Sequence, residues 1–401
     1  MENPKIRFKG FTKDWEQRKV SELSEKTFGG GTPKTSNYSF WKGNIPWIQS
    51  SDLIEDSLFD VEPRKYISKE AVDKSATKLV PENSVAIVTR VGVGKLAFMP
   101  FSYATSQDFL SLCELQTEPQ FIVYALYKKL KLEFNAVQGT SIKGITKDEL
   151  LAQKIMIPCY EEQGKIGNYL HSLDHLITLH QRKCEQTKKL KKYMLQKMFP
   201  QNGAKVPEIR FDGYTYDWEQ RKLGDVCSRV QGNDGRMKLP TLTISAGNGW
   251  MRQEDRFSGN IAGNEQKNYT LLHTGELSYN HGNSKLAKYG AVFSLRNYEE
   301  ALVPRVYHSF RVEEGSADYI EYYFATKLPD RELRKLISSG ARMDGLLNIG
   351  YDEFMGIKMM FPSIKEQNEI AAYFRSLDHL ITLHQRQTDF YKKTSFYFIS
   401  S

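Results

Sequence analysis

Two long stretches of the chain place apolar side chains at alternating intervals of four and three residues. In the first stretch these positions are Ile166, Leu170, Leu173, Ile177, Cys184, Met194 and Met198, with weaker members at His180, Thr187 and Lys191. In the second they are Ile370, Phe374, Leu377, Ile381, His384, Thr388, Tyr391 and Phe398. This heptad spacing is typical of helices that pack along a seam. Prolines flank the stretches at 158, 200 and 362, so the pattern predicts two helices of about 40 residues, each roughly 60 Å long.

Each seam needs a partner surface, because one helix cannot bury its own apolar stripe. We favour packing of the two helices on each other. Packing of each helix on its own globular domain is the alternative. Cysteine pairs placed across the seam would distinguish the two arrangements, since only mutual packing brings such pairs into cross-linking distance.

The chain also repeats itself. Residues 6–19 read IRFKGFTKDWEQRK and residues 209–222 read IRFDGYTYDWEQRK, while residues 172–182 and 376–386 are identical, SLDHLITLHQR. A register held over the whole chain indicates two half-molecules of about 200 residues each. We call these repeated segments the frame.

Between the frame segments lie two inserts, at roughly 24–155 and 227–359, which barely resemble each other. Short runs rich in β-formers, such as SVAIVTR at 84–90 and KLAFM at 95–99, predict strands joined by Gly turns, with helices near 124–134 and 319–328. The fold class is therefore α/β (α+β). A duplicated enzyme would keep its active-site residues in both copies, so a kept frame with unlike inserts favours two readers of different ligands.

Composition narrows the class of protein. The chain has 401 residues with 56 Lys and Arg against 48 Asp and Glu, a net charge of +8 that suits a phosphate-rich partner but also an ordinary basic protein. The spacing of Cys113, Cys159, Cys184 and Cys227 fits reduced thiols rather than a zinc site. We find no signal peptide or apolar run long enough for a membrane span, and we expect a cytoplasmic protein.

Enzyme signatures are missing from the sequence. VGVGK at 91–95 lacks the spacing of a phosphate-binding loop, and no Pro-Pro pair is present for the [DN]-P-P-[YF] loop of amino-methyltransferases. His171 and His175 stand four residues apart, but apolar residues of the seam occupy the buried face of this helix. We therefore expect no metal site and no catalytic residue.

The DWEQRK motif, the late loops GTSIKG (139–144) and SGARMDG (339–345), and the repeated SLDHLITLHQR resemble the specificity subunit of type I restriction–modification systems, HsdS. The resemblance covers essentially the whole chain. It implies two target-recognition domains, at 1–157 and 204–361, and two conserved helical regions, at 158–203 and 362–401. The helices would form an antiparallel coiled coil, with a pseudo-two-fold relation between the halves.

The resemblance also implies a function in restriction and DNA methylation. Each domain would read one half of a split, asymmetric site in double-stranded DNA, and the helices would dock two methyltransferase (modification) subunits, joined by restriction/translocase subunits. The chain itself would be non-catalytic and would hold no cofactor, since S-adenosylmethionine, ATP and Mg belong to the partners. The second helix ends YKKTSFYFISS where the first ends KKLKKYMLQKMFP, so we expect its last turns to pack differently.

Base reading requires donors and acceptors on exposed loops, chiefly Arg, Lys, Asn and Gln. The candidates for DNA binding in the first insert are Arg90, Lys95, Gln107, Ser141 and Lys143. Those in the second insert are Asn280, His281, Asn283, Lys285, Arg305 and Arg342. Turn chemistry is the alternative role for all of them. For Trp41 and Trp47 we favour loop packing over base stacking.

Two other functions stay open. The chain could be a fragment of a fused restriction–methylation enzyme, which a methyltransferase domain in the same chain would reveal. It could instead be a coiled-coil scaffold that binds only protein, which predicts no salt-dependent affinity for DNA.

Overall fold

The structure is a computed structural model, and it describes residues 4, 6–136, 144–257, 263–282, 284–337 and 347–400. The chain forms two compact units: unit 1 comprises Met1–Gln181 and Gln385–Ser401, and unit 2 comprises Arg182–His384. Each unit takes one half of both long helices. The predicted division into two recognition domains and two helical regions therefore stays a prediction. Within the described ranges, no helix has the length and apolar character needed to cross a bilayer.

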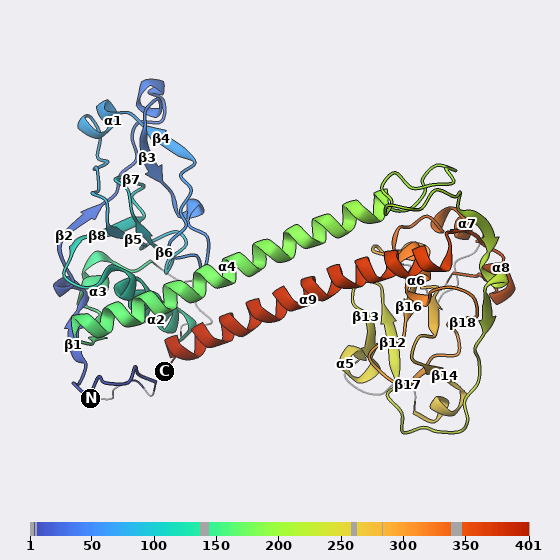
Figure 1. Cartoon of the computed structure of the whole chain (residues 1–401). Coiled ribbons are helices and arrows are strands. Elements are labelled where there is room, and N and C mark those ends of the chain that lie inside the picture. The colour runs from blue at the N-terminus through green and yellow to red at the C-terminus, as the bar shows by residue number, and fades with distance from the viewer. Residues whose placement is uncertain are drawn as a thin grey trace. The chain divides into compact units, whose positions relative to one another are not determined.

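Unit 1 is built on a four-stranded antiparallel sheet (Figure 1). The strand order is β2 (Ser24–Gly29), β8 (Phe109–Leu115), β5 (Ser84–Val88) and β6 (Leu96–Met99). Alternate residues of β5 enter different cores: Val85 and Ile87 pack with the helix α2 (Pro119–Ala136), and Ala86 and Val88 pack on the other face. Because both faces of β5 are covered, its sequence is a continuous apolar run rather than an alternating one.

A second layer of unit 1 forms a separate lobe at the top of Figure 1. It consists of η2 (Tyr38–Trp41), β3 (Ile45–Ile48), η3 (Ser50–Asp52), β4 (Lys65–Ile67), α1 (Lys69–Asp73) and β7 (Ala104–Thr105), with the strand order β4–β3–β7. Phe40, Trp47 and Ile67 form its small core. This lobe belongs to the first insert.

Unit 2 repeats the main sheet in the same order. The strands are β11 (Cys227–Arg229), β18 (His308–Val312), β15 (Leu277–Asn280) and β16 (Ala291–Ser294). Around it lie β12 (Leu242–Ser245) with β13 (Gly249–Arg252), β14 (Thr270–His273) with β17 (Glu300–Val303), and the helical segments α5 (Gln253–Phe257), η5 (Gly263–Asn268), α6 (Ala317–Ala325), α7 (Asp330–Leu336) and α8 (Tyr351–Met355). The unlike inserts thus share a common central sheet.

The frame forms the same contacts in both units. In unit 1, η1 (Val20–Glu22) and α3 (Lys147–Ala152) adjoin the pair β1 (Glu16–Lys19) and β9 (Lys154–Ile157); in unit 2, η4 (Leu223–Asp225) adjoins the pair β10 (Glu219–Lys222) and β19 (Lys358–Phe361). Arg7 bonds to Glu162 in unit 1, and Arg210 bonds to Glu366 in unit 2, with 2.7 Å between Nε and Oε1 each time. Both carboxylates are buried, so each needs its bidentate arginine.

The long helices are α4 (Tyr160–Lys197) and α9 (Ile364–Ser400). In unit 1 the rings of Tyr169 and Phe398 lie 5.2 Å apart and those of His180 and Tyr391 lie 5.7 Å apart. In unit 2, Lys191 of α4 pairs with Asp378 of α9. Residue numbers rise along one helix as they fall along the other, so the helices run antiparallel within each unit and the predicted mutual packing is confirmed.

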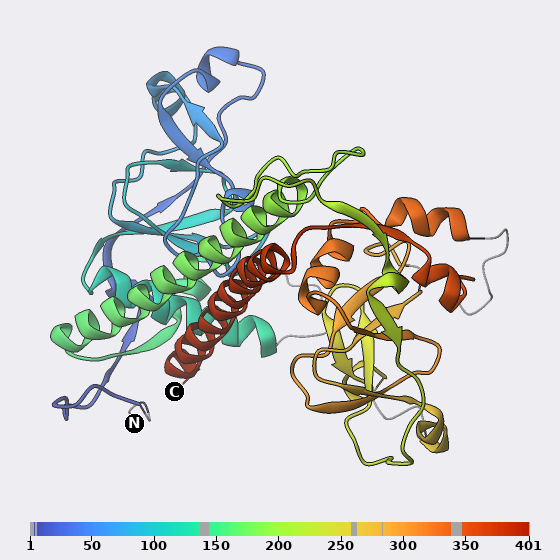
Figure 2. The same ribbon diagram turned by 45° about the vertical axis from the view of Figure 1, so that its right-hand side comes forward.

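The alternative packing is present as well. Ile166, Leu170 and Leu173 of α4 are buried in the core of unit 1. The first turns of α9 are buried in the core of unit 2, where Phe374 lies 5.2 Å from Tyr322 of α6. Figure 2 shows the beginning of the red helix α9 beside the orange helices of unit 2. The first turns of each long helix therefore pack against the globular part of the unit in which that helix begins.

Candidate nucleic-acid interface

Three loop segments of unit 1 meet at the end of the β5–β6 hairpin. The Thr89 N–H donates to the Asp108 carbonyl (2.7 Å), and the Ile145 N–H donates to the Thr89 carbonyl (2.8 Å). A Cβ on Gly144 would lie 2.5 Å from the Thr89 oxygen, so only glycine permits this approach. The bonds bring Arg90, Gln107 and the described end of the late loop together. We call this meeting point the hairpin junction.

Unit 2 contains the same junction at the end of the β15–β16 hairpin. The Leu347 N–H donates to the His281 carbonyl (2.8 Å), as Ile145 does to Thr89 in unit 1. Thr89 lies two residues after Ile87, which pairs with strand β8. His281 likewise lies two residues after Tyr279, which pairs with strand β18. Both inserts therefore present their loop candidates from one scaffold.

The predicted residues of unit 1 take two kinds of place. Arg90 and Gln107 are exposed, and Gln107 Oε1 accepts a hydrogen bond from the Thr32 hydroxyl (2.7 Å). Lys95 donates to the Leu53 carbonyl (3.0 Å), which fixes the hairpin to the lobe. Ser141 and Lys143 lie outside the described residues. DNA contact by any of these residues stays a prediction.

In unit 2, Lys285 and Arg305 are exposed. The Asn280 amide donates to the Ile244 carbonyl (3.1 Å), and its oxygen accepts from the Gly282 N–H (3.0 Å). These bonds give Asn280 a role in the turn, and DNA contact by it stays a prediction. Asn283 and Arg342 lie outside the described residues.

His281 is 5% exposed. Its Nδ1 lies 2.7 Å from the Leu347 carbonyl and its Nε2 lies 2.8 Å from the Val306 carbonyl. This ring ties the hairpin to the 305–306 loop and to the segment after the late loop. The side chain therefore organises the junction from inside, and DNA contact by it stays a prediction.

His308 packs beside His281, with ring centroids 5.0 Å apart. Its Nε2 lies 2.8 Å from the Ile349 carbonyl. Burial is the main cause that lowers the pKa of His308, since the charged ring loses hydration there. Two imidazoles thus anchor the carbonyls that follow the late loop.

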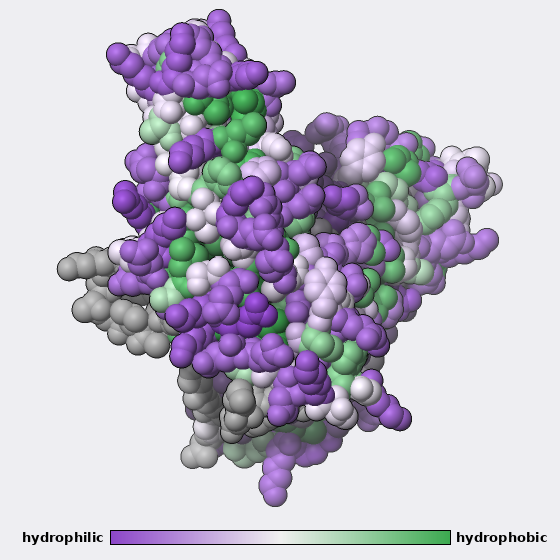
Figure 3. Space-filling view, turned by 90° about the vertical axis from the view of Figure 1, so that its left-hand side faces the viewer, coloured by the Kyte–Doolittle hydropathy of each residue, from purple (hydrophilic) through white to green (hydrophobic). Residues whose placement is uncertain are grey.

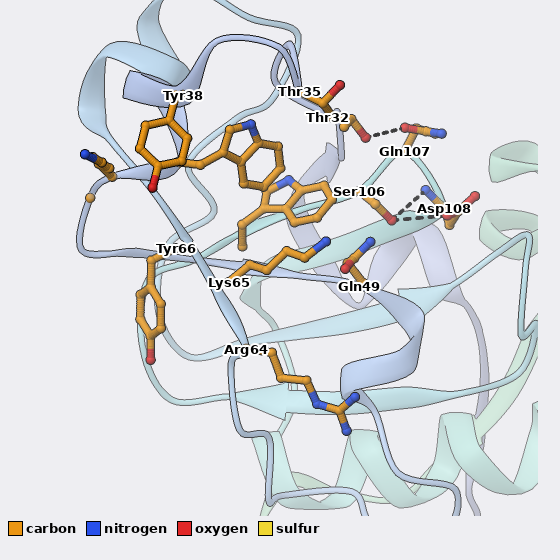
Figure 4. Close-up of a pocket in the computed structure, with 14 residues that line it drawn as sticks. Thr32, Thr35, Tyr38, Gln49, Arg64, Lys65, Tyr66, Ser106, Gln107 and Asp108 are labelled. Carbon is orange, nitrogen blue, oxygen red and sulfur yellow. Dashed lines mark hydrogen bonds between the residues drawn. The ribbon is translucent and has the colours of Figure 1, made fainter.

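A cleft of about 800 Å³ adjoins the junction in unit 1 (Figure 4). It shares Ser106, Gln107 and Asp108 with the junction, and the lobe supplies the rest: Thr32, Thr35, Tyr38, Trp41, Lys42, Gly43, Trp47, Gln49, Arg64, Lys65 and Tyr66. Figure 3 shows that this lobe, at the top of the view, presents mainly hydrophilic residues with apolar ones beneath.

Aromatic and cationic groups alternate around the cleft. Trp41 and Trp47 meet edge to face at 5.0 Å, and the Lys65 Nζ lies 5.8 and 5.6 Å from their ring centroids. Figure 4 shows Lys65 and Gln49 pointing toward one another, with Tyr38 and Tyr66 on the other side. Basic groups beside aromatic faces and amide donors form a surface that suits phosphates and base edges.

Most of this cleft was missed by the sequence reasoning, which had singled out only Gln107 within it for DNA contact. Lys42, Arg64 and Lys65 come from segments that the fold brings together. The run Trp41-Lys42-Gly43, with Trp47 shortly after, was the available signal. The tryptophans themselves pack in the lobe, as predicted: Trp47 is buried and its indole N–H donates to the Gly31 carbonyl (3.0 Å).

Among the described residues, no group of three or more His, Cys, Asp or Glu side chains is placed to hold a metal ion. The four cysteines are free thiols.

Comparison with known proteins finds a matching family over part of the chain. Residues 12–189 match the family described as "Type I restriction modification DNA specificity domain". This part of the chain is similar to a type I restriction–modification specificity domain. The predicted resemblance is confirmed.

The curated relatives that the chain matches are specificity subunits. The chain is 26% identical over 239 residues to the type I restriction enzyme MjaIX specificity subunit of Methanocaldococcus jannaschii, covering 55% of this chain and 54% of the relative. It is 32% identical over 165 residues to the EcoR124I/EcoR124II specificity subunit of Escherichia coli, covering 38% of this chain and 39% of the relative. The chain thus spans about half or less of the length of these relatives.

The whole fold also has a solved counterpart. The S subunit of the type I restriction-modification system from M. genitalium matches with a TM-score of 0.62 at 13% identity, over 99% of this chain and 98% of that chain. The likeness confirms the predicted fold class, including its two globular parts and two long helices.

Proposed function

We propose that this chain is the DNA-reading subunit of a type I restriction–modification complex. Each unit contacts one half of a bipartite, asymmetric site in double-stranded DNA. The observation that carries the proposal is the hairpin junction: one backbone scaffold, present in both units, carries Arg90 and Gln107 in one and Lys285 and Arg305 in the other. Different donors on equal scaffolds favour two different half-sites.

The remaining parts of the complex follow from the same proposal. The helices α4 and α9 dock two methyltransferase subunits, and restriction/translocase subunits join for cleavage. This chain carries out no chemistry, and S-adenosylmethionine, ATP and Mg are bound by the partners. We place the complex in the cytoplasm, where it reaches the cell's DNA.

The first experiment expresses the chain with its companion methyltransferase subunit in a host free of DNA methylation. N6-methyladenine is then mapped by single-molecule sequencing. One split, asymmetric motif methylated on both strands is the expected result. An assembled complex that leaves the DNA unmethylated would contradict the assignment of a functional reader.

Individual residues are tested by the affinity of this complex for its mapped site. We expect Arg90→Ala and Lys285→Ala each to weaken binding about tenfold, since a charged contact to a base or phosphate is worth roughly 1–3 kcal/mol. A residue that contacts a phosphate also reduces the slope of log K against log salt by about one.

Lys13→Ala is the matched control, because Lys13 is an exposed cation in the segment before β1. The same experiment on Lys65→Ala tests the cleft. Affinity that stays unchanged at moderate salt removes the substituted residue from the interface.

A further inference from the structure

The core of unit 2 is closed by one aromatic side chain from the end of α4. Phe199 lies two residues after the last helical residue, Lys197, and is fully buried. Its ring centroid lies 5.7–6.2 Å from those of Trp218, Tyr319, Tyr323 and Phe374. These four residues form the pocket that holds the ring.

Unit 1 has a counterpart for each of the four. Trp15 corresponds to Trp218 in the repeated DWEQRK, and Leu170 corresponds to Phe374, each two residues before the repeated SLDHLITLHQR. The Tyr124 hydroxyl donates to Asp174 (2.6 Å) as that of Tyr322 donates to Asp378 (2.8 Å). This bond aligns α2 with α6.

The alignment places two further residues. Phe121, three residues before Tyr124, corresponds to Tyr319, and Ala125 corresponds to Tyr323. The contact between Trp15 and Phe121 (6.0 Å) also matches the contact between Trp218 and Tyr319 (6.0 Å). The two helices therefore present equivalent faces to the frame tryptophan.

In unit 1 all four counterparts line a mainly apolar cavity of about 250 Å³. Two of them are smaller than in unit 2: Ala125 stands in place of Tyr323, and Leu170 in place of Phe374. Phe398 and Ile399 from the end of α9 also line this space, and the cavity stays open beside them. We call the cavity the unit 1 socket.

The rim of the unit 1 socket is basic and partly apolar. Lys128 and Lys154 lie on it, next to the exposed side chains of Ile6 and Leu132. Burial lowers the pKa of the Lys128 amine, and a carboxylate beside the amine would offset that loss of hydration. The residues that line the socket include no acidic side chain.

We propose that the unit 1 socket docks one aromatic side chain of a partner polypeptide, held between Trp15, Phe121 and Leu170, with carboxylates of the partner next to Lys128 and Lys154. The internal repeat supplies the shape of the occupant, since the same pocket in unit 2 holds a phenylalanine. Charge complementarity supplies the neighbouring acidic residues. A buried aromatic anchor with a charged rim is a common arrangement in protein interfaces.

The test uses the full chain labelled with 5-fluorotryptophan, in which Trp15→Phe assigns the Trp15 fluorine signal. The probe is the peptide acetyl-Asp-Glu-Phe-Glu-Asp-amide, and the same peptide with Ala in place of Phe is its control. We expect the Phe peptide to shift the Trp15 signal saturably. The Ala peptide should bind at least tenfold more weakly.

Variants then localise the binding. Ala125→Tyr restores the larger residue of unit 2 and should weaken binding at least tenfold, whereas Ala125→Ser keeps the space and should leave the affinity unchanged. Lys128→Glu should weaken binding at least fivefold, and it keeps the test valid if Ala125→Tyr does not fold.

Three results would overturn the proposal: no saturable shift at millimolar peptide, equal affinity for the Phe and Ala peptides, or unchanged affinity in both Ala125→Tyr and Lys128→Glu. Self-association of the chain that Ala125→Tyr abolishes, without peptide binding, would assign the socket to a second copy instead. These measurements involve no DNA, so their outcome is independent of the proposed reading of DNA.

Discussion

Strand β15 of unit 2 sets Tyr279 opposite His308, whereas strand β5 of unit 1 sets Ile87 opposite Leu110. Both pairs lie beside the same backbone bond of the hairpin junction. Unit 2 adds a polar interior there, with His308 bonded to the Ile349 carbonyl. Unit 1 has two aliphatic side chains at these positions. The comparison shows that the main-chain bond is the constant part of the junction, and the side chains around it are free to differ.

The helix seams differ in the same way. In unit 2 the Lys191 amine bonds to Asp378 and lies 5.3 Å from the Tyr322 ring. The corresponding residue in unit 1 is Ser395, nine residues after the repeated SLDHLITLHQR, as Lys191 is. Asp174 there accepts the Tyr124 hydroxyl, and burial raises the pKa of its carboxyl. Unit 1 therefore keeps the tyrosine–aspartate bond with a different neighbour on the helix.

The largest expected effect is a loss of stability from a substitution in the core of unit 2. Phe199→Ala should lower the free energy of unfolding by about 3–5 kcal/mol, because a fully buried ring is removed and a cavity is left. Phe398→Ala, at a half-buried ring of unit 1, should lower it by less than half as much. Urea unfolding followed by circular dichroism measures both.

Phe396→Ala is the control, since Phe396 is 68% exposed and should change stability by no more than about 0.5 kcal/mol. Equal losses from Phe199→Ala and Phe398→Ala would show that both units close their cores in the same way.

A prediction of intermediate size concerns the stability of the folded protein at acidic pH. The pKa of His308 is lowered in the folded protein, so below an ordinary histidine pKa of about 6.5 the unfolded state binds more protons than the folded state. Stability should therefore fall as the pH drops through about 6.5, by up to roughly 1.4 kcal/mol per pH unit for one proton. Urea midpoints between pH 7.5 and 5 measure this slope.

His308→Leu copies the residue of unit 1 and should flatten the slope, while His379→Leu, at an exposed histidine, should leave it as it is. A slope that persists in His308→Leu would assign the acid sensitivity to another group.

The smallest expected effect is a gain in stability from a substitution in the helix seam of unit 1. Ser395→Lys introduces the lysine of unit 2 beside Asp174 and should stabilise unit 1 by about 0.5–1 kcal/mol, as partly exposed ion pairs do. The pKa of the Asp174 carboxyl should fall, since a nearby cation favours its charged form. Carboxyl carbon-13 NMR follows the pKa, and thermal unfolding follows the stability. Ser395→Met lengthens the side chain without charge, and an equal gain from it would point to packing rather than pairing.

The repeats allowed the frame and the helices to be predicted, because identical segments in two places had to serve identical contacts. The helices begin at Tyr160 and Ile364, two residues after the prolines that served as predicted start signals. The buried arginine–glutamate pairs were not predicted, since Arg7 and Glu162 are 155 residues apart. Their pairing depends on the fold.

The candidate interface could be predicted only in part. Arg90 and Gln107 were expected on exposed loops, and both side chains are exposed. His281 was expected on the surface, but the loops at 306 and 347 enclose its ring. Lys42 and Lys65 reach one cleft through the pairing of β3 with β4, and no local spacing shows such a meeting.

The matched registers of β1–β9 and β10–β19 have a consequence for how such chains can be altered. Arg18 pairs with Ile155 in one unit, and Arg221 pairs with Met359 in the other, through ladders of four residues each. An insert could be moved from one chain to another by joining the two sequences within these strands. The strand pairing at both ends of the insert would then be unchanged. The two short strand pairs are therefore natural junctions for exchanging one insert while the other is kept.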